Sequence, residues 1–516
     1  MSNRFSDALF QLIHSMHKAE KRNFKLYIKR NSSNQDLKVI QLFDALDRQN
    51  EYDEKALLKK LSSTKTQLAN LKTHLYKEIL ASLRLIKITE SIDLQLHEQL
   101  DYARILYNKG LYLQSLKLLD KAKEIATAYN QDSFLIQVVS LEKKIETLHI
   151  TRSMKDRNDL LTEEANEINE RRSRITKLSN LALQMYSWYV KNGHARNVED
   201  EKRVQQYFDE NLPLGAREFT GFYERLYLYQ SICWYNFIRQ DFLMYYRYAQ
   251  KWMQLFEENE QMINVEPGHY IKGMHNSLNA HFVLRNYRQF DLVLKQFEQY
   301  AGSHTAMYYE NFKVQTFIYL HTAMINQHFM HGTFKEGLKL IPYIEDKLKE
   351  YELYLDNHRV LVFNYKIATL YFGSGDYDTC IDYLNRIIHN NVDLRYDIQC
   401  YARLLHLMSH YELDNFDIIE SLIKSVNRFM KKMETLTKMD EELFKFLRSS
   451  TNIPRQKRKE KLQVFLEKIK QLQKIRFETR AFAYLDILSW VESKVYEKPM
   501  SQIIHEKYMQ SHRRLK

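Results

Sequence analysis

Residues 362–387 read VFNYKIATLYFGSGDYDTCIDYLNRI, and the rest of the chain is interpreted from this stretch. Ile367, Ala368 and Tyr371 are spaced three or four positions apart, which places them on one face of a helix. Gly375 then predicts a tight turn. After the turn comes a second set with helical spacing: Tyr377, Cys380, Leu384 and Ile387. The stretch therefore predicts two helices joined by a short turn, a helical hairpin.

The hairpin resembles a tetratricopeptide (TPR) repeat, whose pattern is small-x-x-aromatic-x-x-x-Gly-x-Tyr-x-x-small. Further hairpins of this kind recur over about residues 94–426, most clearly around Gly110 and Gly332. An aromatic residue after the turn marks the last five: Phe242, Tyr287, Phe334, Tyr377 and Phe416. The resemblance implies an all-α fold, a right-handed superhelical TPR-like α-solenoid with helical caps at both ends.

Charge divides the chain into three parts. Residues 1–90 hold 17 Lys or Arg against 10 Asp or Glu, and residues 427–516 hold 22 against 11, although the net charge of the whole chain is only +12. Two basic ends therefore flank a mildly acidic middle. This uneven distribution of charge carries information about binding partners and not about the fold. We predict a basic helical N-terminal domain (1–90), TPR-like repeats (91–426) and a basic helical C-terminal region (427–516).

Cysteine usage and hydropathy predict a cytoplasmic protein. The three cysteines are far apart and have no CxxC spacing, as expected of reduced, buried thiols. The longest uncharged run, 314–334, is long enough to span a membrane, but it carries His321, Asn326, Gln327, His328 and His331, which hydrocarbon would not accommodate cheaply. We expect no membrane partner.

The first helix of each hairpin lines the concave groove in TPR-like repeats. Aligning the hairpins predicts a groove that is rich in aromatic and amide side chains. Its candidate peptide-binding residues are Tyr227, Gln230, Trp234, Lys272, His275, Asn279, Phe282, Tyr319, Asn326, Phe329, Tyr365 and Thr369. Asn279 and Asn326 occupy the same repeat position, which resembles the asparagine clamps of peptide-binding TPR proteins. The alternative is that stacked helices bury these side chains against each other.

The basic ends suggest a different partner. A short helix (EYDEKALLKKL), an SST break and a long helix to about Lys87 have the outline of a helix-turn-helix. In this interpretation the residues that contact nucleic acid are Lys65, Gln67, Asn70 and Lys72, with Arg455, Lys457 and Arg458 at the other end. The alternative is that the N-terminal helices only cap the solenoid.

No motif in the sequence indicates catalysis. There is no phosphate-binding loop of the GxxxxGK[ST] type and no HExxH, and the His406/His410 pair lacks a third metal ligand. We therefore predict no catalytic residues, no metal and no cofactor. The first functional hypothesis is a non-enzymatic cytoplasmic interaction protein that binds a peptide or protein partner in the groove. The second is a nucleic-acid-binding regulator that uses the basic N-terminal domain, with the solenoid as its sensor or partner-binding module.

Overall fold

A computed structural model describes residues 7–30, 36–87, 91–149, 157–352, 354–389, 395–450, 455–475, 477–478 and 484–513. These residues form helices and turns without strands, which confirms the all-α prediction for the described part of the chain. The chain divides into two compact units between Ile168 and Asn169, inside helix α9 (Arg157–Asn192). We call the two parts the N-terminal unit and the C-terminal unit and describe each by itself.

The N-terminal unit contains two hydrophobic cores. The first is built by α1 (Ala8–Ser15), α2 (Lys18–Arg30), α3 (Asp36–Asp47), α4 (Glu54–Leu61) and α5 (Lys65–Lys87), around the buried side chains of Phe10, Phe24 and Phe43. The second is built by α6 (Ile92–Asn108), α7 (Tyr112–Ala128), α8 (Asp132–Leu148) and the start of α9. The predicted short helix, break and long helix are therefore present as α4 and α5. Ser62 adopts a φ of +49° in the turn where a glycine is usual.

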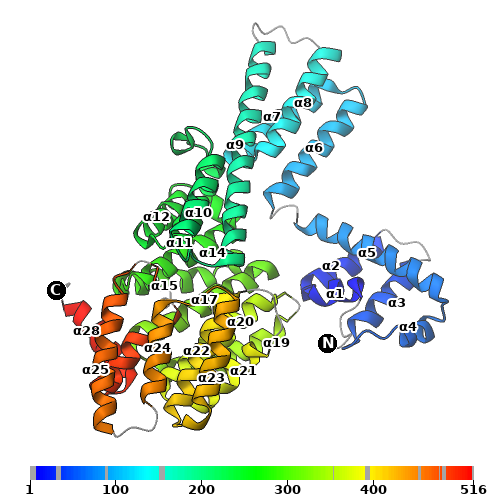
Figure 1. The fold of residues 1–516 in the computed structure, drawn as a ribbon. Helices are drawn as coiled ribbons and strands as arrows, with labels where there is room; N and C mark the ends of the chain where they lie inside the picture. Colours follow the sequence, from blue (N-terminus) through cyan, green and yellow to red (C-terminus); the bar gives the residue numbers. More distant parts are fainter. Residues whose placement is uncertain are drawn as a thin grey trace. The chain divides into compact units, whose positions relative to one another are not determined.

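The C-terminal unit consists mainly of helices that pack as sequence-adjacent pairs (Figure 1). The pairs that carry the predicted markers are α11 (Phe222–Ile238) with α12 (Phe242–Glu257), α14 (Pro267–Val283) with α15 (Tyr287–Ala301), α17 (Glu310–His331) with α18 (Phe334–Gly337), α20 (Asn357–Ser374) with α21 (Tyr377–Ile388), and α22 (Tyr396–Glu412) with α23 (Phe416–Lys432). The remaining helices are α10 (Val198–Asn211), α13 (Gln261–Val265), α16 (His304–Tyr308), α19 (Ile341–Glu350), α24 (Lys438–Ser450), α25 (Arg455–Leu472), α27 (Ile487–Val495) and α28 (Met500–Arg513). This pairing is consistent with an α-solenoid.

One backbone conformation recurs at the hairpin turns. The residue two positions before the marker aromatic is left-handed in all five hairpins: Gln240 (φ +61°), Arg285 (+54°), Gly332 (+72°), Gly375 (+89°) and Asp414 (+56°). Only two of these are glycine, the residue that adopts positive φ without strain. The turns are therefore alike in geometry although three of them lack the glycine of the repeat pattern.

Helices near the C-terminus pack back onto the helix pairs. Helix α28 contacts α15, α17 and α20. At Gly332 the approach is so close that a Cβ would overlap the backbone oxygen of Ser501. Tyr484, just before α27, reaches the interior, where its hydroxyl donates to Asp397 Oδ2 over 2.6 Å. A segment from the end of the chain thus supplies a wall for the site described below.

The structure also bears on two other predictions, the burial of the cysteines and the rejection of residues 314–334 as a membrane span. All three cysteines are buried and free, as the prediction of buried thiols requires. No helix in the described ranges combines the length and the apolarity needed to cross a bilayer, and this includes α17, which contains most of the uncharged run.

Candidate functional site

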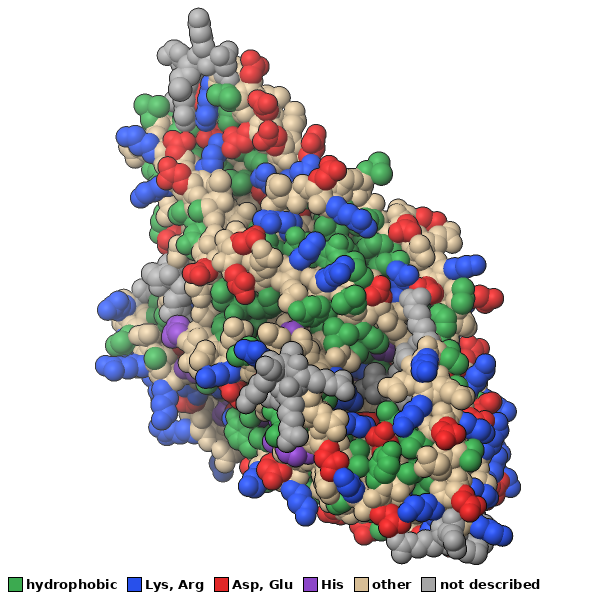
Figure 2. All heavy atoms as spheres, turned by 90° about the vertical axis from the view of Figure 1, so that its left-hand side faces the viewer, with side chains coloured by type: hydrophobic (Ala, Val, Ile, Leu, Met, Phe, Trp, Pro, Cys, Tyr) green, Lys and Arg blue, Asp and Glu red, His purple; other side chains and the backbone are tan. Residues whose placement is uncertain are grey.

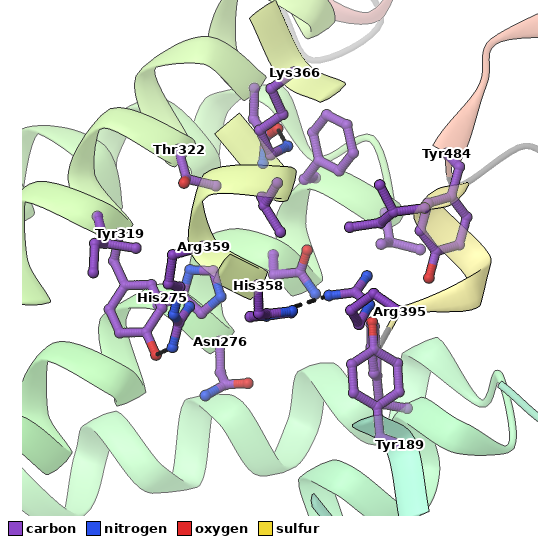
Figure 3. Close-up of a pocket in the computed structure, with 18 of the residues that line it drawn as sticks. Tyr189, His275, Asn276, Tyr319, Thr322, His358, Arg359, Lys366, Arg395 and Tyr484 are labelled. Atoms are coloured by element: carbon purple, nitrogen blue, oxygen red, sulfur yellow. Dashed lines mark hydrogen bonds between the residues drawn. The ribbon is translucent and has the colours of Figure 1, made fainter. Parts of the chain in front are cut away.

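The first helices of successive hairpins enclose a cavity of about 240 Å³, which we call the central cavity. Helices α11, α14, α17 and α20 supply most of its lining, because the residues on one face of each first helix point the same way in every hairpin. The end of α9, the start of α12, the region of Arg395 and Tyr484 complete the walls. The side chains labelled in Figure 3 converge on this space from these separate elements.

Among the described residues, the lining contains four cationic side chains and no carboxylate. Lys366 Nζ donates to Asn326 Oδ1 (2.5 Å) and lies 5.5 Å from the ring centre of Phe329. Lys272 Nζ lies over two aromatic rings, 4.9 Å from the centre of Tyr186. All of these partners are neutral.

Arg359 is held in a similar way. Its guanidinium donates to the Tyr319 hydroxyl (3.0 Å) and lies over the same ring (Figure 3). Asp356 is close in sequence, but its carboxylate is exposed and accepts from the backbone N–H of Arg359. Within the described ranges no carboxylate forms an ion pair with Lys272, Arg359 or Lys366, and we call these three side chains the cavity cations.

Arg395 is the fourth cation and differs from the other three. Its guanidinium forms two hydrogen bonds with the Asp397 carboxylate, over 2.8 and 2.7 Å. Burial alone would raise the pKa of Asp397, but the charge and bonds of Arg395 outweigh it and hold that pKa below its usual range. The Arg395–Asp397 pair is therefore neutral overall and serves as a reference for the unpaired cations.

Burial makes the two cavity lysines, Lys272 and Lys366, weaker acceptors of protons. It lowers the pKa of Lys272 to about 8, with a further contribution from the positive charge of Arg359. It also lowers the pKa of Lys366 to about 8, where Arg395 adds to the shift. His275 is affected most: burial and the charges of all three cavity cations lower its pKa to about 3. At neutral pH the cavity therefore holds neutral histidine and incompletely solvated positive charge.

The side-chain amides of the cavity provide both hydrogen-bond donors and hydrogen-bond acceptors. Asn279 donates from Nδ2 to the Tyr245 hydroxyl (3.3 Å), and among the described residues its Oδ1 has no donor. Asn326 accepts from Lys366 at Oδ1, and its Nδ2 has no acceptor within the same set. Asn276 is bonded at both its oxygen and its nitrogen, since it accepts from Tyr245 and donates to the backbone of Lys272. One acceptor and one donor thus remain available.

Aromatic side chains form the apolar walls. Tyr319 stacks on His275 with ring centres 4.2 Å apart and planes at 21°. Trp234 stacks on Tyr189 (5.3 Å, 28°). Such rigid faces offer contact area at a small cost in side-chain entropy.

The structure brings nine of the twelve predicted groove residues to the central cavity. They are Trp234, Lys272, His275, Asn279, Phe282, Tyr319, Asn326, Phe329 and Tyr365. Tyr227 lies outside the cavity and stacks against Tyr223. Gln230 is buried between helices, which is the environment that the alternative interpretation predicted for all twelve residues. Thr369 lines a smaller neighbouring hollow, and its hydroxyl donates to the backbone of Tyr365. That these residues bind a peptide stays a prediction.

The predicted nucleic-acid contacts are in mixed environments. Lys65, Gln67, Asn70 and Lys457 are exposed. Lys72 is half-buried, paired with Asp7 and bonded to the Tyr52 hydroxyl (2.8 Å), and Arg458 lies over the Phe416 ring. The side chain of Arg455 lies outside the described residues. On the face drawn in Figure 2, Lys and Arg side chains are interspersed with Asp and Glu.

Several lining residues were absent from the prediction. Arg359 lies on the same face of α20 as Val362 and Lys366, three and seven positions on, and this spacing was a usable signal. Arg395 and Tyr484 lie outside the first helices of the aligned hairpins, so no repeat position pointed to them.

The two histidines that were considered for metal binding lie next to each other in the structure. His406 and His410 have ring centres 4.5 Å apart. Within the described ranges, no three or more His, Cys, Asp or Glu side chains are arranged to hold a metal ion.

Comparison with known proteins adds no assignment: no family model, no curated protein and no solved structure matches this chain.

Proposed function

We propose that this protein is a non-enzymatic interaction protein whose C-terminal unit receives an extended segment of a peptide or protein partner in the central cavity. The observation that carries the proposal is the lining of the cavity: aromatic faces, two half-satisfied amides and cations that no described carboxylate neutralises. A cavity that served only as packing would have its polar groups satisfied internally.

The shape of the space favours an extended ligand. A second hollow of about 50 Å³ shares Phe282, Phe329 and Tyr484 with the central cavity. A third hollow of about 320 Å³ shares Val190, His194 and Tyr484 with it. The three spaces thus adjoin one another, and an extended chain fits such a path better than a compact ligand does.

The free amide groups suit a peptide backbone. Asn279 Oδ1 is able to accept from a backbone N–H, and Asn326 Nδ2 is able to donate to a backbone C=O. Each bond would add about 0.5–1.5 kcal/mol to binding. In this proposal the paired helices form a right-handed, TPR-like superhelix in the cytoplasm, and the cavity is its concave face.

Site-specific crosslinking tests the proposal. A photo-reactive phenylalanine analogue replaces Phe282 in the cavity, and in a control protein it replaces Leu292, which is exposed on the second helix of the same hairpin. After irradiation in cells, mass spectrometry maps the adducts. We expect defined peptide segments at position 282 and none at position 292. Equal yields at both positions, or adducts within the chain alone, would contradict the proposal.

The N-terminal unit supports a second candidate, nucleic-acid binding. Lys59, Lys60 and Lys65 are exposed around the α4–α5 turn, and none of them forms an ion pair with a described residue. Phosphate contacts of this kind weaken steeply with salt. The full-length protein with Lys59, Lys60 and Lys65 changed to Glu should bind duplex DNA less tightly and with a smaller salt slope. Unchanged binding would remove this candidate.

A further inference from the structure

The cavity cations require an explanation that packing does not provide. Burying a charge without a counter-charge is costly, and proteins normally pair such groups or leave them in water. Here three cations share one lining that holds no carboxylate among the described residues, while the nearby Arg395 shows that the same region is able to supply one. The protein therefore keeps positive charge in a place where it destabilises the ligand-free state.

The three cations line the same cavity, and the positive charge of each acts on His275. Lys272 lies one helical turn before His275 on α14, and Arg359 is bonded to Tyr319, whose ring stacks on His275. Lys366 enters from α20 on the same face as Arg359. An anion placed beside His275 would be approached from two helices.

We propose that the central cavity is a phosphate site, in which Lys272, Arg359 and Lys366 bind a phosphate or diphosphate group of the ligand. A single carboxylate carries one negative charge and would leave two of the cations unpaired. A phosphate monoester carries nearly two charges at neutral pH and a diphosphate more, so that either comes closer to neutralising all three. The three terminal oxygens each accept more than one hydrogen bond, so they are able to serve two lysines as well as a bidentate contact from the planar guanidinium of Arg359.

The surroundings indicate what the phosphate is attached to. Tyr319, Trp234 and Phe329 place aromatic faces beside the cations, which suits a ligand with a flat or apolar body. The inference deepens the proposed function and rests on the same cavity. The phosphate has two sources that share this chemistry: a phosphorylated side chain of the bound peptide, or a free nucleotide-like compound.

Calorimetric titration of the full-length protein with inorganic pyrophosphate tests the phosphate site, with acetate as the carboxylate probe. Lys272→Gln, Arg359→Gln and Lys366→Gln should each weaken pyrophosphate binding by about tenfold or more, because each removes a charge-assisted hydrogen bond. The matched control is Lys295→Gln, an exposed lysine of α15, which should leave binding unchanged. Lys366→Arg keeps the charge and should retain binding, which separates loss of contact from misfolding.

The outcomes are distinct. Pyrophosphate binding that disappears in the cavity variants alone supports the proposal. No binding to the wild-type protein, binding that survives in all three variants, or acetate bound as tightly as pyrophosphate overturns it. ADP and a phosphoserine peptide then separate the two sources: tighter binding of either than of pyrophosphate supports the proposal, and binding of neither overturns it. Crosslinking at position 282 does not depend on these charges, so it tests the proposed function independently of the phosphate site.

Discussion

Several lysines of the N-terminal unit form ion pairs with carboxylates, whereas the lysines of the central cavity form none with the described residues. The lysine pairs of α1 to α5 include Lys21–Asp47 (2.6 Å), Lys25–Asp44 (2.6 Å), Lys87–Glu20 (3.0 Å) and Lys72–Asp7. In the cavity, Lys272 and Lys366 contact aromatic rings and one amide oxygen. The basic end of the chain thus neutralises several of its cations internally, and the mildly acidic middle holds cations that it does not neutralise.

The difference shows what a charge count omits. Net charge reports how many cations a segment has, and it does not report which of them are paired. Pairing depends on contacts between residues that are far apart in sequence, such as Asp7 with Lys72. The location of unpaired charge is therefore the better indicator of an anionic partner.

The two kinds of lysine should respond to pH in opposite directions, and we expect the largest effect here. Lys272 and Lys366 have pKa values of about 8 in the folded state, below the ordinary value of 10.5. Between these values the unfolded chain binds more protons, so stability rises with pH. From pH 8 to 9.5 the two lysines together should add about 3 kcal/mol to the free energy of unfolding of the C-terminal unit.

Tryptophan fluorescence during denaturant unfolding measures this rise, because all four tryptophans lie in the C-terminal unit. The Lys272→Met/Lys366→Met double variant should lose the dependence. At Lys72 the sign is reversed: burial alone would lower its pKa, but the bonds to Asp7 and Tyr52 outweigh burial and raise it. Its contribution is complete below about pH 10.5 and is lost above. An equal slope in the wild-type protein and the double variant would refute the assignment of unpaired lysines.

Breaking a pair in the N-terminal unit should be the next largest effect. Asp7→Asn keeps a side chain that is able to cap α1 but leaves Lys72 without its counter-charge, which should cost about 2 kcal/mol since both groups are mostly buried. Asp44→Asn is the control, because the Lys25–Asp44 pair is more exposed and should cost less than about 1 kcal/mol. Faster hydrogen exchange in α1 and α5 measures the loss, and equal exchange in the two variants would mean that burial of the pair is unimportant.

Removing one unpaired cation should have the opposite sign. Lys366→Met deletes a half-buried charge without a counter-charge among the described residues and should stabilise the ligand-free C-terminal unit by about 1–3 kcal/mol at pH 7. The loss of the bond to Asn326 reduces the gain. Unfolding followed by tryptophan fluorescence gives the value, and a clear destabilisation would show that Lys366 has a counter-charge in solution.

A neutral group of the same cavity should change stability least. Asn279→Ala removes one long hydrogen bond to the Tyr245 hydroxyl and should cost less than about 1 kcal/mol. Affinity for a peptide recovered by crosslinking should nevertheless fall several-fold. A large fall in melting temperature with unchanged affinity would place Asn279 in the packing rather than in the binding site.

The hairpins were predictable from the sequence because helical periodicity and the marker aromatic depend on near neighbours. The turns of the weaker hairpins were harder to predict. Their turn residues Gln240, Arg285 and Asp414 have a positive φ, a conformation that is usually recognised in a sequence by a glycine. The lining of the central cavity was largely predictable for the same reason: the position within the hairpin decides which way Asn279, Asn326 and Phe329 point. The contact of Tyr484 with Asp397 and the contact of α28 with Gly332 were not predictable. Each joins residues more than 80 positions apart, and no repeated pattern in the sequence relates the two positions.

The most direct test of the account is the pKa of the cavity lysines, measured by NMR on protein labelled with ¹³C-lysine and assigned with Lys272→Arg and Lys366→Arg. We expect two resonances that titrate near pH 8 in the ligand-free protein and move to higher pH when pyrophosphate is added. If both lysines titrate near 10.5 and ignore pyrophosphate, the cavity holds no unpaired charge and the proposed phosphate site is wrong.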